Sequence, residues 1–201
     1  LSLCLQVATL VGALLLVVLH LSFGDPHQFW APFVRDLAEQ MKSHGLPMDL
    51  EKDGLADTLA RTLWGWVAVL TMLLAMCALF LARWWQSLPG AAGSFGEEFR
   101  ELRLGRVLSV VTALAVLLLA AGFVSLGGGL LLVLGTGFAA QGLAVVHWTA
   151  DAWRWPRIWP LVLYAPLLLG APWAGLLLLG LALAGIADNG FALRRRRSNV
   201  V

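Results

Sequence analysis

The stretch IWPLVLYAPLLLGAPWAGLLLLGLALAGIADNGFALRRRR, residues 158–197, decides how this chain folds. A long apolar run, Ile158 to Ala187, is followed by one aspartate and then by the four arginines Arg194–Arg197. Lys and Arg beside membrane spans collect on the cytoplasmic side of the bilayer. The stretch therefore predicts a membrane protein with a cytoplasmic carboxyl end, and the number of spans before it has to agree with that orientation.

The composition of the whole chain points in the same direction. Of its 201 residues, 60% are hydrophobic and 13% are charged, and the mean hydropathy is +0.81. A soluble domain is about half apolar and about a quarter charged. The net charge of +2 is too small to indicate a nucleic-acid-binding protein. Six tryptophans stand where apolar runs meet charged stretches, as expected at headgroup depth: Trp84, Trp85, Trp148, Trp153, Trp155 and Trp159.

Four further apolar runs precede residue 158. Each is close to the length that a helix needs to cross the hydrocarbon core, about 20 residues. We therefore predict an all-α, polytopic membrane helix bundle that forms a single domain over residues 1–201. Ser125 and the run Gly127–Gly129 predict a tight turn between the third and fourth spans. The predicted spans are residues 1–23, 64–81, 107–123 and 130–148.

The apolar run 158–187 could be one tilted helix or two short ones. The loops 82–106 and 149–157 carry arginines and are predicted to be cytoplasmic. With both loops inside, a single last span would put the arginine tail outside, whereas a hairpin of two spans returns it to the inside. Three helix breakers stand midway in the run, where a turn is needed: Pro166, Gly170 and Pro172. We predict six spans, the last two at residues 158–169 and 172–187, with the tail 189–201 cytoplasmic.

The one long polar segment, residues 24–62, has apolar side chains at helical spacing between Phe29 and Met41, with charged residues opposite. We predict an amphipathic periplasmic helix there, which could lie on the membrane surface or cap the bundle. A second, short amphipathic helix is predicted at Glu97–Arg103. The chain begins Leu1-Ser2-Leu3, without Met and already apolar, so we expect native residues to precede it.

The predicted fourth span is rich in small residues. Such residues allow helices to approach closely, and Gln141 can hydrogen-bond across the contact. One interpretation is a packing helix at the centre of the bundle. The other is that the glycines leave room for a small molecule, with Gly135, Thr136, Gln141 and Gly142 as its binding residues.

Charged residues gather at the predicted cytoplasmic ends of the spans. His147 and Asp151 are four residues apart and share one helix face. The group could be an ion-pair cluster, a proton relay through the histidine, or a metal site of His147, Asp151 and Asp188. We predict the first, a cytoplasmic polar cluster of Arg103, Arg106, His147, Asp151 and Asp188. The tail predicts a topology anchor that attracts anionic lipid headgroups through Arg194, Arg195, Arg196 and Arg197.

Catalytic and nucleotide-binding signatures are missing from the sequence. It contains no GxSxG, no HExxH, no P-loop and no Rossmann fingerprint. The run Gly127–Gly129 lacks the context of a phosphate-binding loop. We therefore expect no catalytic residue, no metal, no cofactor and no enzyme activity.

Four stretches carry a resemblance to a known family. They are residues 81–86 (LARWWQ), 93–104 (GSFGEEFRELRL), 141–147 (QGLAVVH) and 185–188 (GIAD). Together they resemble the YybS-like family of predicted bacterial membrane proteins, a domain family of unknown function. The resemblance implies a multi-pass protein of the bacterial inner membrane. It also implies an architecture similar to the substrate-binding subunits of energy-coupling-factor transporters and to the rod-shape protein MreD.

Two functions follow as predictions. The first is binding of a small molecule within the bundle, as in a transporter's substrate-binding subunit, with the fourth span lining the site. The second is a non-catalytic scaffold or assembly subunit of a cell-envelope complex, which would dock a partner protein through Phe29–Met41 or Glu97–Arg103. Both place the chain in the lipid bilayer, and neither involves nucleic acid. A binder needs a polar cavity near Gln141, whereas a scaffold needs none.

Overall fold

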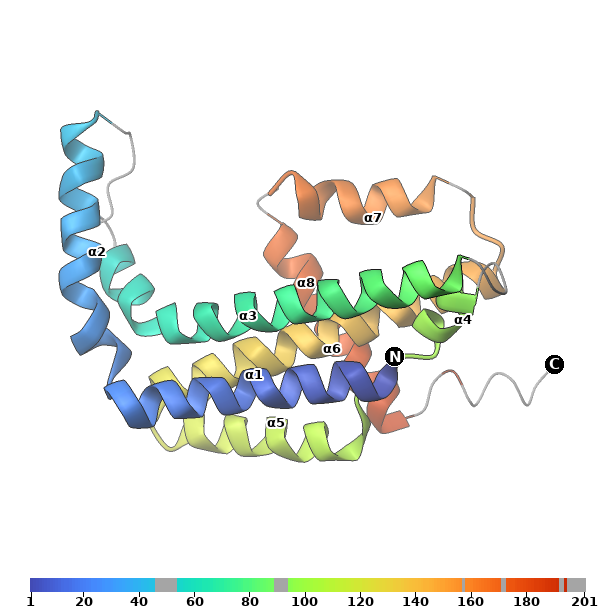
Figure 1. Cartoon of the computed structure of the whole chain (residues 1–201), viewed down its shortest axis with the longest axis horizontal. Helices are drawn as coiled ribbons and strands as arrows, with labels where there is room; N and C mark the ends of the chain where they lie inside the picture. Colours follow the sequence, from blue (N-terminus) through green and yellow to red (C-terminus); the bar gives the residue numbers. More distant parts are fainter. Residues whose placement is uncertain (46–53, 89–93, 157, 171–172, 192–193, 195–201) are drawn as a thin grey trace. The chain divides into compact units, whose positions relative to one another are not determined.

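The computed structural model describes residues 1–45, 54–88, 94–156, 158–170, 173–191 and 194. Over these residues the chain is helical and contains no strand, which confirms the all-α prediction. The helices follow one another along the chain as shown in Figure 1: α1 (Ser2–Phe23), α2 (Pro26–Ser43), α3 (Leu55–Ser87), α4 (Ser94–Arg100), α5 (Gly105–Ala120), α6 (Val124–Ala152), α7 (Trp159–Leu168) and α8 (Ala174–Phe191).

Four of these helices, α1, α3, α6 and α8, are long and apolar enough to cross a membrane. The pair α4 and α5, which bends by 46°, passes the same test when it is taken as one span. Helix α7 is apolar but shorter. The described residues thus fit a membrane protein with four or five spans, whereas the sixth span and the periplasmic position of α2 are still predictions.

Large apolar side chains point outward from these helices. Leu3, Leu74 and Leu176 are 71%, 73% and 72% exposed. Many large apolar side chains besides these three are exposed, and extensive apolar surface is rare on soluble monomers, because water solvates it poorly. In a bilayer the same leucines contact lipid tails that are as apolar as they are. The outer surface therefore agrees with the membrane assignment.

The apolar run 158–187 is broken in the middle. Helix α7 ends at Leu168 and α8 begins at Ala174. Between them Gly170 has a φ of +62°, in the left-handed region that glycine enters without strain. Pro166 lies inside α7, and Pro172 lies outside the described residues. The prediction of two helices in place of one rod is confirmed, and their crossing of the membrane as a hairpin is untested.

The chain divides into two compact units. Unit 1 contains residues 1–10, 73–111 and 134–201, and unit 2 contains residues 11–72 and 112–133. The boundaries fall within α1, α3, α5 and α6, so these helices contribute to both units. The grouping of all spans into one domain is still a prediction.

In unit 2, α2 begins directly after α1 and is amphipathic, as the spacing from Phe29 to Met41 predicts. Asp25 caps its first turn with a side-chain hydrogen bond. Its outer face leaves Phe33 and Leu37 exposed. On its inner face, Ala31 and Val34 are buried against Ala60 of α3.

The turn predicted at Ser125 and Gly127–Gly129 is wrong, because these residues lie inside α6. The chain turns instead at Gly122, whose φ is +92°. A Cβ on Gly127 would approach the Leu119 backbone nitrogen of α5 to 2.6 Å. A Cβ on Gly129 would likewise approach the Leu16 side chain to 2.9 Å, so Gly127 and Gly129 serve close packing of helices within unit 2. A turn signal read from the sequence does not distinguish this use of glycine.

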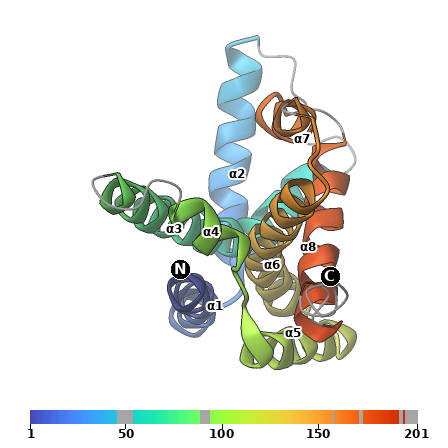
Figure 2. The same cartoon turned by 90° about the vertical axis from the view of Figure 1, so that its right-hand side faces the viewer.

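In unit 1, α6 and α8 lie side by side (Figure 2). A methyl group on Gly142 would collide with the carbonyl group of Leu181, and one on Gly185 would collide with the carbonyl group of Phe138. Only glycine fits at these two positions without a shift of the backbone. The two helices thus touch backbone to backbone, which fixes the position of the residues that follow on each of them.

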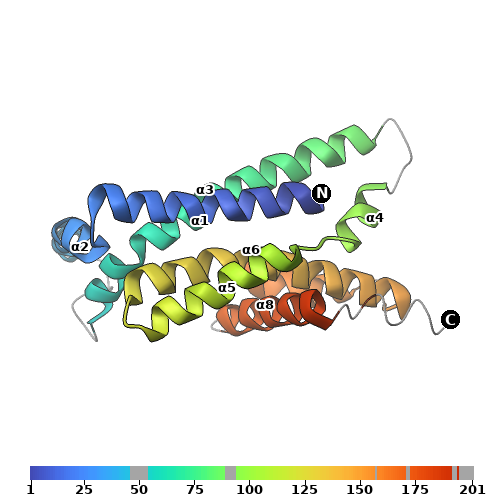
Figure 3. The ribbon, with the colours of Figure 1, turned by 90° about the horizontal axis from the view of Figure 1, so that it is seen from below.

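Helices α4 and α5 run in different directions (Figure 3). Helix α4 ends at Arg100, and α5 opens at Gly105, whose φ is +75°. Residues 101–104 between them are not helical, and we call them the α4–α5 linker. The short helix predicted for Glu97–Arg103 is present, but it begins earlier, at Ser94, and ends before Glu101.

Candidate functional site

The α4–α5 linker interrupts a helix at a buried position in unit 1. The side chains of Leu102 and Leu104 are 0% and 1% exposed. A broken helix leaves backbone N–H and C=O groups without partners, and each costs several kcal/mol, roughly, in an apolar medium. Side chains of other helices therefore have to supply the missing hydrogen bonds. From α1, Gln6 Nε2 donates to the Arg103 carbonyl at 3.0 Å, and Ser2 Oγ accepts from Arg103 N at 3.2 Å.

A buried ion pair supports the linker from the carboxyl end of the chain. Asp188 of α8 is 0% exposed and Arg194 is 6% exposed. Arg194 Nη2 donates to Asp188 Oδ2 at 2.6 Å, and Nε lies 3.2 Å from each carboxylate oxygen. The same guanidinium group donates to the Leu102 carbonyl at 2.6 Å and to the Arg100 carbonyl. One side chain thereby neutralises a buried carboxylate and satisfies two carbonyls, one at the end of α4 and one in the linker.

Gln141 connects this ion pair to the other end of the linker. Its Nε2 donates to Asp188 Oδ2 at 3.0 Å. Its Oε1 accepts from Leu104 N at 2.9 Å. The side chain is fully buried, so these hydrogen bonds replace those that it would make with water.

Asn189 performs the same task at the start of α5. Its Oδ1 accepts from Gly105 N at 2.9 Å, and its Nδ2 donates to the Gly105 carbonyl at 2.8 Å and to Ser109 Oγ at 2.7 Å. We call Gln141, Asp188, Asn189 and Arg194 the linker network.

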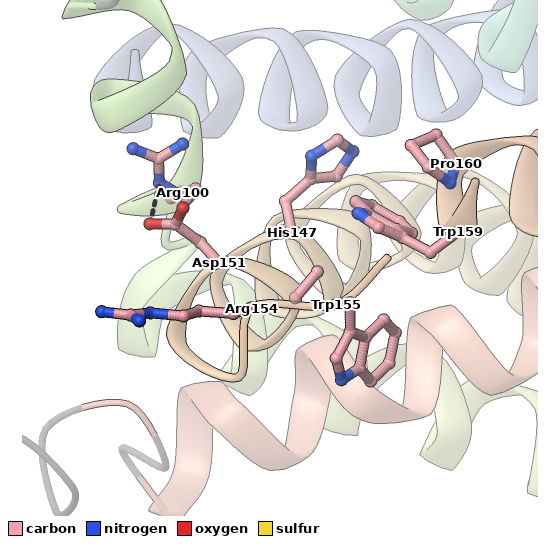
Figure 4. Close-up of a pocket in the computed structure, with 8 residues that line it drawn as sticks. Arg100, His147, Asp151, Arg154, Trp155, Trp159 and Pro160 are labelled. Atoms are coloured by element: carbon pink, nitrogen blue, oxygen red, sulfur yellow. Dashed lines mark ion pairs between the residues drawn. The ribbon is translucent and has the colours of Figure 1, made fainter. Parts of the chain in front are cut away.

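A second group of charged residues surrounds a hollow at the end of α6 (Figure 4). The hollow has a volume of about 420 Å³. We call it the charged hollow. It is lined by Arg100, His147, Ala150, Asp151, Arg154, Trp155, Trp159 and Pro160.

The charged groups of this hollow are held loosely in comparison with the linker network. Arg100 Nε lies 3.7 Å from Asp151 Oδ2, beyond hydrogen-bond distance, and Asp151 is 69% exposed. Arg154 adopts a φ of +50°, in the left-handed region that a non-glycine residue rarely occupies. In Figure 4, His147 lies between the Arg100–Asp151 pair and the ring of Trp159.

His147 is fixed by its neighbours. Its Nε2 lies 2.7 Å from the hydroxyl oxygen of Tyr164, a hydrogen bond that joins α6 to α7. The rings of Trp159 and Phe99 meet it edge to face, with centroid distances of 4.7 and 5.3 Å. An imidazole held this way keeps its orientation toward the hollow.

This arrangement suits an anion with a planar or apolar part. Arg100 and Arg154 bring two positive charges against the single carboxylate of Asp151. Guanidinium groups bind carboxylates and phosphates through paired N–H donors. The indoles of Trp155 and Trp159 supply apolar walls with a polar edge. Among the described residues, no group of three His, Cys, Asp or Glu side chains could hold a metal ion.

The residues predicted to bind a ligand in the fourth span do not share one environment. Gln141 is engaged by the linker network, and Gly142 lies against the backbone of α8. A methyl group on Gly135 would meet no atom within 4 Å. These contacts agree with the packing interpretation of Gln141 and Gly142, while a ligand at Gly135, Thr136, Gln141 and Gly142 stays a prediction.

The predicted polar cluster is divided by the structure. Asp188 belongs to the linker network, whereas His147 and Asp151 line the charged hollow. Arg103 contributes its backbone to the linker, and in the part of the chain that the structure describes its side chain and that of Arg106 form no ion pair. Spacing along α6 places His147 and Asp151 together correctly, because both lie on one helix.

The arginine tail also differs from its expectation at the one residue that is described. Arg194 is buried against Asp188, so its guanidinium group is not available to lipid headgroups. Arg195, Arg196 and Arg197 lie outside the described residues. Arg194 is buried because the buried carboxylate of Asp188 needs a cation beside it. A lipid headgroup in contact with water has no such need.

Several residues of both groups were not singled out from the sequence: Arg100, Arg154, Tyr164 and Asn189. In the sequence, Arg100 and Arg154 stand among the loop charges that predict the topology, and no spacing relates them to His147. The tyrosine is unique in the chain and stands within an apolar run, which is a signal for a polar partner.

Comparison with protein-family models, with curated proteins and with solved structures finds no match, so the resemblance to the YybS-like family is still a prediction.

Proposed function

We propose that this chain is a non-catalytic, multi-pass protein of a bacterial inner membrane and that it binds a small anionic molecule in the charged hollow. The observation that carries the proposal is the hollow itself, where two arginines, a fixed histidine and two tryptophans meet around about 420 Å³. Binding sites for small molecules are concave, with a few polar groups set among apolar and aromatic walls, and typically measure about 300–1,000 Å³.

The place of Arg154 at the end of α6 supports this choice of site. Its φ of +50° ends the helix, and Trp155 N donates to the Ala150 carbonyl at 2.9 Å across the turn. The chain leaves α6 at this residue, and Arg154 lines the hollow. The proposal moves the binding site from Gln141, whose hydrogen bonds are used within the protein, to the end of the same helix.

The proposed topology has six spans with the carboxyl end in the cytoplasm. The break between α7 and α8 supports it, because two helices in place of one allow the chain to return to the side that it left. A reporter enzyme that is active only in the periplasm, fused after Val201, should be inactive. Activity of that reporter would refute the six-span count.

Thermal unfolding of the purified protein in neutral detergent micelles tests the binding proposal. Butyl phosphate serves as the anion probe and butanol as its uncharged counterpart. A ligand that binds only the folded state raises the unfolding temperature, so butyl phosphate should stabilise the protein and butanol should not.

Matched variants locate the site. Arg154→Gln should weaken butyl phosphate binding about tenfold or more, because a hydrogen bond to a charged group contributes about 1.5–3 kcal/mol. Arg106→Gln removes the same charge from an exposed position outside the hollow and should bind as the unmodified protein does. Equal affinities of the two variants would refute binding at the hollow.

One observation favours the scaffold function as a second candidate. Phe33 and Leu37 on the outer face of α2 are 56% and 40% exposed. The double variant Phe33→Asp, Leu37→Asp should lose a partner protein that co-purifies with the unmodified chain. If the same partners co-purify with both proteins, the docking role of α2 is refuted.

A further inference from the structure

A second hollow lies next to the charged one in unit 1. It has a volume of about 460 Å³. Among the described residues that line it, none is charged. Besides two tryptophans, the lining consists of Val146, Pro156, Ile158, Val162, Leu163 and Leu177. We call it the apolar hollow.

The two hollows share walls. Trp155 and Trp159 line both of them, and their ring centroids lie 6.0 Å apart. From these rings the charged hollow extends to Arg100 and Arg154, whereas the apolar hollow extends along α7 to Leu163. A bound molecule could therefore pass from a cationic region to an apolar one beside the same pair of indoles.

We infer that the ligand is an anionic amphiphile, with its phosphate or carboxylate group in the charged hollow and an apolar chain in the apolar hollow. This inference rests on the proposed function and names the class of molecule that the site takes. Charge complementarity selects the headgroup, because two arginines and one aspartate line the charged hollow. The two shared tryptophans select the chain, because they place the apolar hollow directly beside the charged one and an apolar chain would fill it.

The tryptophans fit the junction of such a molecule. An indole has an apolar body and one N–H donor, and it prefers the level at which a membrane changes from headgroups to hydrocarbon. Trp155 follows the end of α6, and Trp159 is the first residue of α7. Both stand where an arginine-bearing loop meets an apolar helix. A headgroup bound by Arg154 and a chain beside Val162 would then have the orientation of a lipid in its own leaflet.

A series of alkyl phosphates tests the inference. All three phosphates carry the same headgroup. Inorganic phosphate has no alkyl chain, butyl phosphate has a short one and octyl phosphate has a long one. Octanol carries the long chain without the headgroup. Each is titrated into the full chain in maltoside micelles and followed by thermal unfolding. Full burial of a methylene group raises affinity about fourfold, so octyl phosphate should bind at least tenfold more tightly than butyl phosphate.

Two variants on α8 separate the apolar hollow from the detergent micelle. Leu177→Trp fills the apolar hollow, whereas Leu176→Trp adds the same side chain at a neighbouring position that is 72% exposed and does not line it. Leu177→Trp should weaken octyl phosphate binding about tenfold and leave inorganic phosphate binding within about twofold. Leu176→Trp should change neither.

The outcomes distinguish this inference from the proposed function. If octyl phosphate binds no more tightly than butyl phosphate, or if the two leucine variants behave alike, the amphiphile is refuted while anion binding that depends on Arg154 stands. If octanol binds as tightly as octyl phosphate, the anionic headgroup is refuted. If no phosphate stabilises the protein, or Arg154→Gln binds all of them normally, both the inference and the proposed function fail.

Discussion

The linker network and the charged hollow contain similar side chains in opposite states. In the network, Asp188 and Arg194 are buried and every contact is within the protein. In the hollow, Arg100 and Asp151 lie 3.7 Å apart, and the carboxylate is largely exposed. A charged group whose hydrogen bonds are all used by the fold stabilises structure, whereas a group with unused capacity beside an open volume can bind a ligand. The state of the hydrogen bonds, and not the residue type, separates the two roles.

The strongest way to break this comparison is to remove one member of the buried pair. Arg194→Ala leaves Asp188 as an uncompensated buried charge, and it also leaves the carbonyl groups of Arg100 and Leu102 without a donor. We expect a loss of about 3–5 kcal/mol in the free energy of unfolding. Thermal or denaturant unfolding in micelles measures it.

Arg154→Ala is the matched control, because it removes an arginine from the charged hollow. It should leave the stability nearly unchanged while it weakens anion binding. The double variant Asp188→Leu, Arg194→Met should recover part of the stability, since it removes both buried charges together. Equal destabilisation by Arg194→Ala and Arg154→Ala would mean that the two regions do not differ as described.

Two glycines of α6 should give smaller changes in stability, with opposite signs, when they are replaced by alanine. Gly142 lies in the contact with α8, and Gly135 does not. Gly142→Ala forces a methyl group onto the Leu181 carbonyl and should destabilise the protein by about 1–3 kcal/mol. Gly135→Ala meets no atom within 4 Å, and it should stabilise the protein by up to about 1 kcal/mol through helix propensity. Thermal unfolding measures both, and destabilisation of similar size at the two positions would contradict the packing.

Gln141→Leu distinguishes the two positions considered for a ligand. The variant leaves Leu104 N without an acceptor and should lower the free energy of unfolding by about 1–2 kcal/mol. A ligand site at Gln141 predicts that the variant also loses stabilisation by ligand. A site at the charged hollow predicts that butyl phosphate still raises its unfolding temperature, measured as a shift relative to the variant without probe.

The sequence predicted those features of the fold that depend on neighbouring residues. The apolar runs, the amphipathic pattern of α2 and the breakers near Gly170 act over a few residues, and each corresponds to an element or a break in the structure. The prediction of where α6 begins was wrong, because glycine occurs both in turns and in close contacts between helices. Composition alone does not tell these two uses apart.

The candidate sites were harder to predict because their partners are distant in the sequence. Arg194 donates to the Leu102 carbonyl across 92 residues, and Asn189 binds Gly105 across 84. No spacing rule reaches that far. His147 and Asp151 were paired correctly since they lie on one helix, but the return of α7 that brings Tyr164 to His147 depends on a turn whose direction the sequence leaves open.

The smallest expected effect sharpens the comparison from the side of the hollow. Asp151 is exposed and only loosely paired with Arg100, so Asp151→Asn should leave the unfolding temperature unchanged within error. It removes the negative charge that competes with a bound anion, and butyl phosphate should therefore bind about threefold more tightly. The corresponding change in the network, Asp188→Asn, should destabilise the protein without tightening the binding of the probe. Weaker binding by Asp151→Asn would show that Asp151 orients Arg100 for the anion, and the open arrangement of the hollow would then be as ordered as the network.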